Sequence, residues 1–264
     1  MDLQLTNKTA LVTGATAGIG WAIAKTLARE GVEVTITGRS PSKLDDAVAS
    51  IKDAAPSAVV HGLVADLATP GGVQAVTAAL PNVDILVNNL GFYEAKPFAE
   101  ITDDDWARML ELNLMSGIRL SRHYFPRMLS RNWGRVLFIS SEVGAFTPPD
   151  MIHYGVSKSA QLAVARGMAE LTQGTQVTVN SVLPAATRSE GIVEYLRTTA
   201  PQPGMSDAEI EAHFFKTYRP SSLIARMIDA DEIAAMVALL ASPLGAASNG
   251  AAVRVEGGSY RSIL

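Results

Sequence analysis

The sequence contains no cysteine, and this absence removes several kinds of chemistry at once. Disulfides, thiolate nucleophiles and thiolate metal sites are all excluded, so any catalysis must use other side chains. His61, His123 and His213 show no ligand spacing. The sequence therefore predicts no catalytic metal.

Other features are also missing. No apolar run approaches the roughly 20 residues of a membrane helix, and residues 1–5 lack the basic-then-apolar pattern of a signal peptide. With 22 basic against 26 acidic residues, there is no broad basic field for nucleic acid or anionic lipid. We expect a cytoplasmic protein that acts on a small molecule, with no nucleic-acid or membrane partner.

What is present is a regular alternation of short apolar runs and helical patterns. This rhythm predicts an α/β fold of the Rossmann type, a doubly wound parallel sheet of about seven strands with helices on both faces. Because 264 residues with 48% hydrophobic content suit one large core, we expect a single domain over residues 1–264. The expected strands are 9–13, 32–37, 59–64, 85–88, 135–140, 176–182 and 252–255, and the main expected helices are 18–30, 69–80, 103–131 and 151–171.

Residues 189–226 interrupt this rhythm with Pro201, Pro203, Gly204 and Pro220. The segment is interpreted as an insertion that forms a lid over an apolar substrate. The alternative is a helical hairpin whose large side chains pack on the core. Those side chains are Tyr195, Leu196, Met205, His213, Phe214, Phe215 and Tyr218.

A glycine-rich turn follows the first expected strand and leads directly into a helix. Glycines allow close approach to a pyrophosphate, and the free amides of the helix N-terminus stabilise its charge. The alternative is a glycine-rich turn without a ligand. The expected contacts of the turn are Gly14, Thr16, Ala17, Gly18, Ile19 and Gly20.

Arg39 follows the second expected strand, near the expected place of the adenosine ribose. A carboxylate there would favour NAD, whereas an arginine pairs with the 2′-phosphate of NADP, for which Gly38 leaves space. The sequence thus favours NADP(H) and leaves NAD(H) as the alternative, in which Arg39 is a solvated surface residue.

Tyr154 and Lys158 are four residues apart at the start of an expected helix, so both lie on one face. A tyrosine titrates near pH ~10, and a neighbouring ammonium favours its phenolate. Such a pair is also common on ordinary helix surfaces. Whether the pair is catalytic therefore depends on the other motifs in the sequence.

The companions are Asn88-Asn89-Leu90-Gly91, Asn113 and Ser140-Ser141, each in order along the chain. Together with the glycine turn, they resemble the classical short-chain dehydrogenases/reductases over nearly the whole sequence. The resemblance implies an NADP(H)-dependent oxidoreductase that interconverts a ketone or aldehyde and an alcohol. Alternatives are an NAD-linked alcohol dehydrogenase and a non-catalytic, nucleotide-sensing Rossmann protein; a halohydrin dehalogenase-like lyase is disfavoured, because that group typically lacks the glycine turn.

The resemblance also implies roles for individual residues. Ser141 would orient the substrate oxygen, Tyr154 would transfer its proton, Lys158 would hold the nicotinamide ribose, and Asn113 would position a water in the proton relay. The implied cofactor contacts, besides the turn and Arg39, are Asp66, Leu67, Asn88, Gly91, Tyr154, Lys158, Pro184 and Thr187, with Ser189 a further candidate.

Two positions depart from the family pattern: Leu90 replaces an alanine, and Ala185 replaces the glycine after a proline. The walls of the predicted site are Phe92, Tyr93, Glu142, Val143, Phe146, Pro149 and Met151. Glu142 is expected either to recognise a polar substrate group or to face water. His153 is expected at the pocket rim or a dimer surface. The family also implies a homo-oligomer, a dimer or tetramer, formed through helices 103–131 and 151–171.

Overall fold

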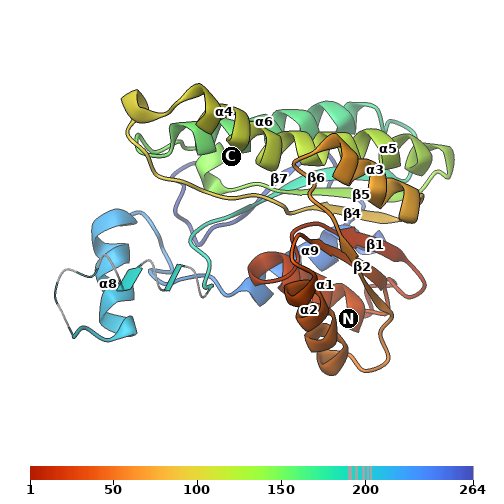
Figure 1. Cartoon of the computed structure of the whole chain (residues 1–264), viewed down its shortest axis with the longest axis horizontal. Coiled ribbons are helices and arrows are strands. Elements are labelled where there is room, and N and C mark those ends of the chain that lie inside the picture. The colour runs from red at the N-terminus through yellow and green to blue at the C-terminus, as the bar shows by residue number, and fades with distance from the viewer. Residues whose placement is uncertain (190–191, 194–195, 198–199, 201, 203, 264) are drawn as a thin grey trace.

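The computed structural model describes residues 1–263 except 190, 191, 194, 195, 198, 199, 201 and 203. Seven parallel strands form one sheet in the order β3-β2-β1-β4-β5-β6-β7 (Figure 1). All seven predicted strands are present within two residues of their expected bounds, which confirms the Rossmann-type α/β class. They are β1 (Thr9–Val12), β2 (Glu33–Gly38), β3 (Val60–Val64), β4 (Ile85–Asn88), β5 (Gly134–Ile139), β6 (Val177–Pro184) and β7 (Ala252–Val255).

Helices cover both faces of the sheet (Figure 1). One layer contains α1 (Gly18–Arg29), α2 (Pro41–Ala54) and α9 (Ala230–Ala241). The other contains α3 (Pro70–Ala79), α4 (Asp103–Leu110), α5 (Ser116–Ser130) and α6 (Ile152–Glu170). Side-chain caps begin two of these helices: Ser40 caps α2, and Thr102 forms a capping box with Asp105 on α4.

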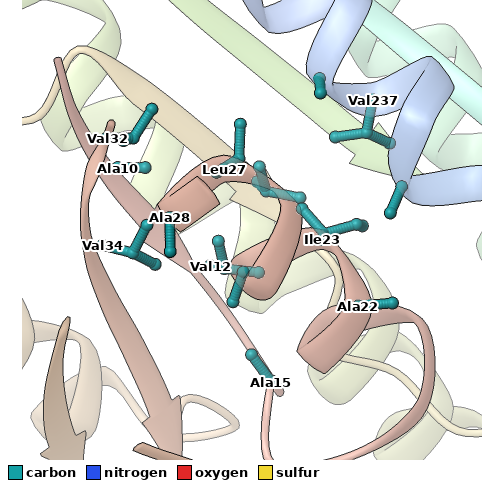
Figure 2. Close-up of a cluster of buried hydrophobic side chains, with 14 of the residues drawn as sticks. Ala10, Val12, Ala15, Ala22, Ile23, Leu27, Ala28, Val32, Val34 and Val237 are labelled. Carbon is teal, nitrogen blue, oxygen red and sulfur yellow. The ribbon is translucent and has the colours of Figure 1, made fainter. Parts of the chain in front are cut away.

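Alternation along the strands divides the core into two clusters. In β1, Ala10 and Val12 face the α1 layer, whereas Leu11 faces the opposite cluster. Figure 2 shows the first cluster, in which Ile23 of α1 and Val237 of α9 pack together over the strands. Because both faces are covered there, the central strands β1, β4 and β5 are buried and largely apolar.

The helix expected over residues 103–131 is present over residues 103–130, but it contains a π-helical turn. α4 ends at Leu110, a π-helical turn spans Glu111–Met115, and α5 begins at Ser116. The extra residue in a π-turn widens the helix locally, and such turns occur frequently at functional sites. The turn holds Asn113, whose side chain bonds the backbone of Phe92 rather than facing the helix surface.

The described part of segment 189–226 forms a small unit of its own. Its longest helix, α8 (Asp207–Tyr218), stands apart from the sheet at the left of Figure 1. Leu196, Ile210, Phe215 and Met227 make a separate apolar cluster, so these side chains do not pack into the main core as the hairpin alternative required. Tyr195, Pro201 and Pro203 lie outside the described residues. Within the described chain, no helix combines the length and apolar character needed to span a bilayer.

Candidate active site

The site lies where parallel strands end at a common edge. β1, β4, β5 and β6 are adjacent in the sheet, so the residues after them converge. Asn89, after β4, donates from Nδ2 to the carbonyl oxygens of Thr13 and Gly14, at 2.9 and 3.0 Å. The loop after β4 therefore braces the glycine turn after β1.

The glycine turn has the conformation that its sequence requires. Gly14 and Gly18 both have positive φ, +61° and +59°. A Cβ on Gly20 would lie 2.4 Å from the Nδ2 of Asn89. Ala17, the N-cap of α1, makes no side-chain capping bond, and the first turn contains no acid. The first amides of α1 therefore remain free for an anionic group such as a pyrophosphate.

The neighbouring strand ends complete a cradle that fits a dinucleotide. The Oδ1 atom of Asn88 is buried and has no hydrogen-bond partner within the described structure. Leu67 is buried near the end of β3, and Arg39 is exposed at the end of β2. Gly38 does not simply leave space, because a Cβ there would lie 2.5 Å from the methyl group of Thr16. Gly38 therefore lets the glycine turn approach β2.

Ser141 is the N-cap of a short 3₁₀ turn directly after β5. Its hydroxyl accepts a hydrogen bond from the Val143 amide at 3.2 Å and donates one to Oε2 of Glu142 at 2.8 Å. The same hydroxyl lies 3.5 Å from the carbonyl oxygen of Pro184, at the end of β6. Ser141 is thus fixed between two strand ends.

The first turns of α6 bring Tyr154 and Lys158 to the same place. The Nζ atom of Lys158 lies 5.7 Å from the centre of the Tyr154 ring. It donates to the carbonyl oxygen of Ile139 at 2.8 Å, and it lies 3.4 Å from Oε1 of Gln161. The predicted one-face geometry is present, and the lysine is buried at the end of β5.

Burial dominates the protonation of both groups. Desolvation raises the pKa of the Tyr154 phenol above its usual range, and hydrogen bonding with Ser141 offsets only part of that rise. Desolvation also lowers the pKa of Lys158 to about 7. The expectation that Lys158 would lower the pKa of Tyr154 is therefore not met in the free chain, because burial outweighs the other influences and the neighbouring Glu142 and Tyr93 raise this pKa further.

Asn113 is buried at the π-turn, and its amide is fully engaged. Oδ1 accepts from the Phe92 amide at 2.9 Å, while Nδ2 donates to the Phe92 carbonyl at 2.9 Å and to Oγ of Ser157 at 3.0 Å. The main-chain carbonyl of Asn113 accepts from Nε2 of Gln161. Asn113 thereby joins the loop after β4 to α6 and leaves only its main-chain oxygen for contacts with the lysine region.

Gln161 was not among the predicted site residues. Its side chain bonds the carbonyl of Asn113 and approaches Nζ of Lys158, so it connects the π-turn with the lysine. Its spacing of three residues from Lys158 places both on one helix face and was the available signal. Glu142, one of two open possibilities in the sequence, does not face water: it is 4% exposed and bonds Ser141.

His153 does not lie at a rim, because its side chain is completely buried. Its Nε2 atom lies 3.3 Å from Oε2 of Glu94, and its ring makes an edge contact with Trp106. It therefore ties the loop after β4 to α6, one residue before Tyr154. In the part of the chain that the structure describes, no group of three His, Cys, Asp or Glu residues is arranged to hold a metal.

The departures from the family pattern are accommodated locally. Leu90 packs against Gly14, and a Cβ added to Gly14 would lie 3.0 Å from the Cα of Leu90. Ala185 does not need the positive φ that favours glycine, and its carbonyl accepts from the Thr187 hydroxyl at 2.8 Å. Thr187 also forms an isolated bridge with Ile228, which anchors the start of the inserted segment.

Known proteins share this whole architecture. The model of the short chain dehydrogenase family matches residues 8–199. The oxidoreductase YvaG of Bacillus subtilis is 45% identical over 100% of both chains. A 3-oxoacyl-[acyl-carrier-protein] reductase of Vibrio cholerae is 32% identical over 98% of this chain and 99% of its own length.

A solved structure of comparable shape is L-sorbose reductase from Gluconobacter frateurii in complex with NADPH and L-sorbose. It superimposes with a TM-score of 0.91 and 26% identity, with 100% of both chains covered. Together with the sheet order, the glycine turn and the convergence of Ser141, Tyr154 and Lys158, these matches assign the chain to a family. The chain is an oxidoreductase of the short-chain dehydrogenase/reductase family.

Proposed function

We propose that the chain is an NADP(H)-dependent oxidoreductase that interconverts a ketone or aldehyde and an alcohol, with Tyr154 as acid and base. The observation that carries the proposal is the meeting of Ser141, Tyr154 and Lys158 at one sheet edge, beside a glycine turn whose helix N-terminus is uncapped. The nicotinamide, when bound, supplies or accepts the hydride.

Side chains of the protein supply the proton that the reduced substrate oxygen takes up. Reduction makes an alkoxide at the substrate oxygen, and donors already placed there stabilise it where its charge develops. Ser141 orients that oxygen, and Tyr154 protonates it. Lys158 binds the ribose and replenishes the proton, and its pKa of about 7 suits that exchange at neutral pH. Asn113 holds the surrounding elements together.

The direct test is a panel of ketones and aldehydes with NADPH, followed by loss of absorbance of the reduced cofactor. We expect carbonyl-dependent NADPH oxidation that obeys saturation kinetics. Measuring NADPH binding in parallel separates the two classes of function. Tight cofactor binding without turnover across a broad panel would contradict the enzyme proposal and favour a nucleotide-sensing protein.

Preference for NADP(H) is attributed to Arg39, whose exposed guanidinium stands at the end of β2. Two similar structures support this preference. The L-sorbose reductase was solved with NADPH, and a putative NAD(P)-dependent gluconate 5-dehydrogenase from Beutenbergia cavernae was solved with NADP. The second protein is 29% identical, with a TM-score of 0.86 over 99% of this chain and 100% of that chain. Pro184 and Thr187 are proposed to contact the nicotinamide end, and Asp66 the adenine.

Arg39→Asp is expected to reduce the ratio of kcat/KM with NADPH to kcat/KM with NADH by about 10- to 100-fold. The change removes a charged hydrogen-bond donor and adds repulsion toward the 2′-phosphate. Lys52→Asp, on the exposed part of α2, is the control for the same change in net charge. An unchanged ratio in Arg39→Asp would place the phosphate site elsewhere.

Two further proposals concern a substrate lid and the assembly of several chains. We propose that the described residues of segment 189–226, with α8 as their largest element, form a lid over the substrate, because the segment follows β6 directly at the site edge. We also propose a homo-oligomer through α4, α5 and α6. Light scattering tests this second proposal, and the mass of a single chain would exclude it.

A further inference from the structure

Glu142 is an unusual neighbour for the serine that orients the substrate. Its side chain is only 4% exposed, and no lysine, arginine or histidine among the described residues pairs with it within 4 Å. Among the described residues, its side chain bonds the hydroxyl of Ser141, at 2.8 Å. Buried carboxylates without an ion pair are costly, so such a group at a site calls for a polar partner.

The hydrogen bond between Ser141 and Glu142 also creates a conflict. A serine hydroxyl has a single hydrogen, and its nearer acceptor here is Oε2 of Glu142 at 2.8 Å, against 3.5 Å for the carbonyl oxygen of Pro184. While that bond lasts, Ser141 has no hydrogen to donate to a substrate carbonyl. The conflict is resolved if the substrate brings a donor of its own to Glu142, because the serine hydrogen is then released toward the carbonyl oxygen.

Arg219, at the end of α8, acts on the same carboxylate. Its charge opposes the rise in the pKa of Glu142 that burial and the charge of Glu256 produce. Its Nε atom is buried and without a hydrogen-bond partner in the described structure. The arginine charge therefore favours the ionised carboxylate, which is the form of Glu142 that accepts hydrogen bonds.

We propose that Glu142 is a specificity-determining residue whose carboxylate accepts a hydrogen bond from a hydroxyl group on the carbon next to the reacting carbonyl, so that the substrates are α-hydroxy ketones. The proposal rests on the function proposed above. In such a substrate the two oxygens stand on adjacent carbons. One accepts from Ser141 while the other donates to Glu142, whose Oε2 lies 2.8 Å from the serine oxygen.

The test compares hydroxyacetone with 2-butanone, which differ only by a hydroxyl in place of a methyl group. The measured quantity is the ratio of their kcat/KM values with NADPH, in the wild type and in Glu142→Leu. Comparing ratios between enzymes cancels the different intrinsic reactivities of the two ketones. We expect Glu142→Leu to lower the ratio by about 10- to 100-fold, the range for a hydrogen bond to a charged group.

Glu142→Gln keeps the shape and one acceptor, so its ratio should lie between those of the wild type and Glu142→Leu, and it serves if the leucine variant folds poorly. Asp84→Asn is the control for loss of a partly buried acid, because Asp84 pairs with Arg131 just before β4, at the end of the sheet away from Ser141. Its ratio should stay within about threefold of the wild type.

Different failures have different meanings. If no ketone is reduced by the wild type, the proposed function itself is wrong. If ketones are reduced but Glu142→Leu leaves the ratio within threefold, the inference on Glu142 is overturned and the proposed function stands. Faster turnover of aminoacetone than of hydroxyacetone, lost in Glu142→Leu, would also overturn it, because the carboxylate would then be a site for a substrate ammonium.

Discussion

Tyr154→Phe is expected to lower kcat for carbonyl reduction by about 10²- to 10⁴-fold while cofactor binding changes little. The substitution removes only the hydroxyl that transfers the proton, and a positioned general acid contributes a factor of this size. The ring, with its edge contact to Tyr93, is retained. Rate assays with NADPH measure the change in kcat, and a binding titration measures the change in cofactor affinity.

Tyr124→Phe is the matched control for this change. Tyr124 is also buried and donates through its hydroxyl, in this case to the carbonyl oxygen of Leu80 at 2.7 Å. Its loss should cost about 1 kcal/mol of stability and leave kcat unchanged. Near-wild-type turnover in Tyr154→Phe would refute the acid–base role of the tyrosine.

Lys158→Met is expected to abolish turnover and, unusually, to stabilise the cofactor-free chain. The pKa of Lys158 is lowered to about 7 by burial, from an ordinary value of 10.5. Between these two pH values the unfolded chain binds more protons than the folded chain, so wild-type stability rises with pH through this interval. Below pH 7 the full cost of burying the ammonium remains.

A methionine carries no such cost. The variant should therefore exceed the wild type in free energy of unfolding by about 2–4 kcal/mol at pH 6, with the advantage shrinking toward pH 10. Urea unfolding at several pH values, without cofactor, measures the difference.

Lys25→Met provides the comparison for Lys158→Met. Lys25 is also largely buried, yet it pairs with Asp231 at 2.8 Å. Replacing it removes an ion pair, so it should lower stability or leave it unchanged and should retain turnover. A difference between Lys158→Met and wild type that does not vary with pH would contradict the lowered pKa of Lys158.

The strands and the strand-to-helix turns were predictable because their signals are local. A parallel sheet buried on both faces requires apolar runs, and these runs end at glycine, asparagine or serine in the sequence itself. The π-turn at Asn113 was not predictable in this way. It depends on bonds to Phe92 and Ser157, whose positions follow from the packing of α4 against α6 and not from the helical period of residues 103–131.

In the candidate site, too, the sequence indicated some features, whereas others became visible only in the folded structure. The residue types and their order indicated Ser141, Tyr154 and Lys158, because few chemistries need that set. Burial was not visible in the sequence, yet it lowers the pKa of Lys158 and is the largest cause of the raised pKa of Tyr154. The position of Glu142 was also undecided until the turn after β5 directed its side chain to Ser141.

The contact between α1 and α9 has a consequence for biosynthesis. Ile23 and Leu27 of α1 share one cluster with Val237 of α9 (Figure 2). Lys25 of α1 also pairs with Asp231 of α9. During translation, the side of α1 that packs against α9 has no partner until α9 has been made, although β1, β2 and α2 can cover the rest of the helix earlier. Such late, long-range closure slows folding and exposes aggregation-prone surface to chaperones. Shortening the chain before α9 would make that exposure permanent.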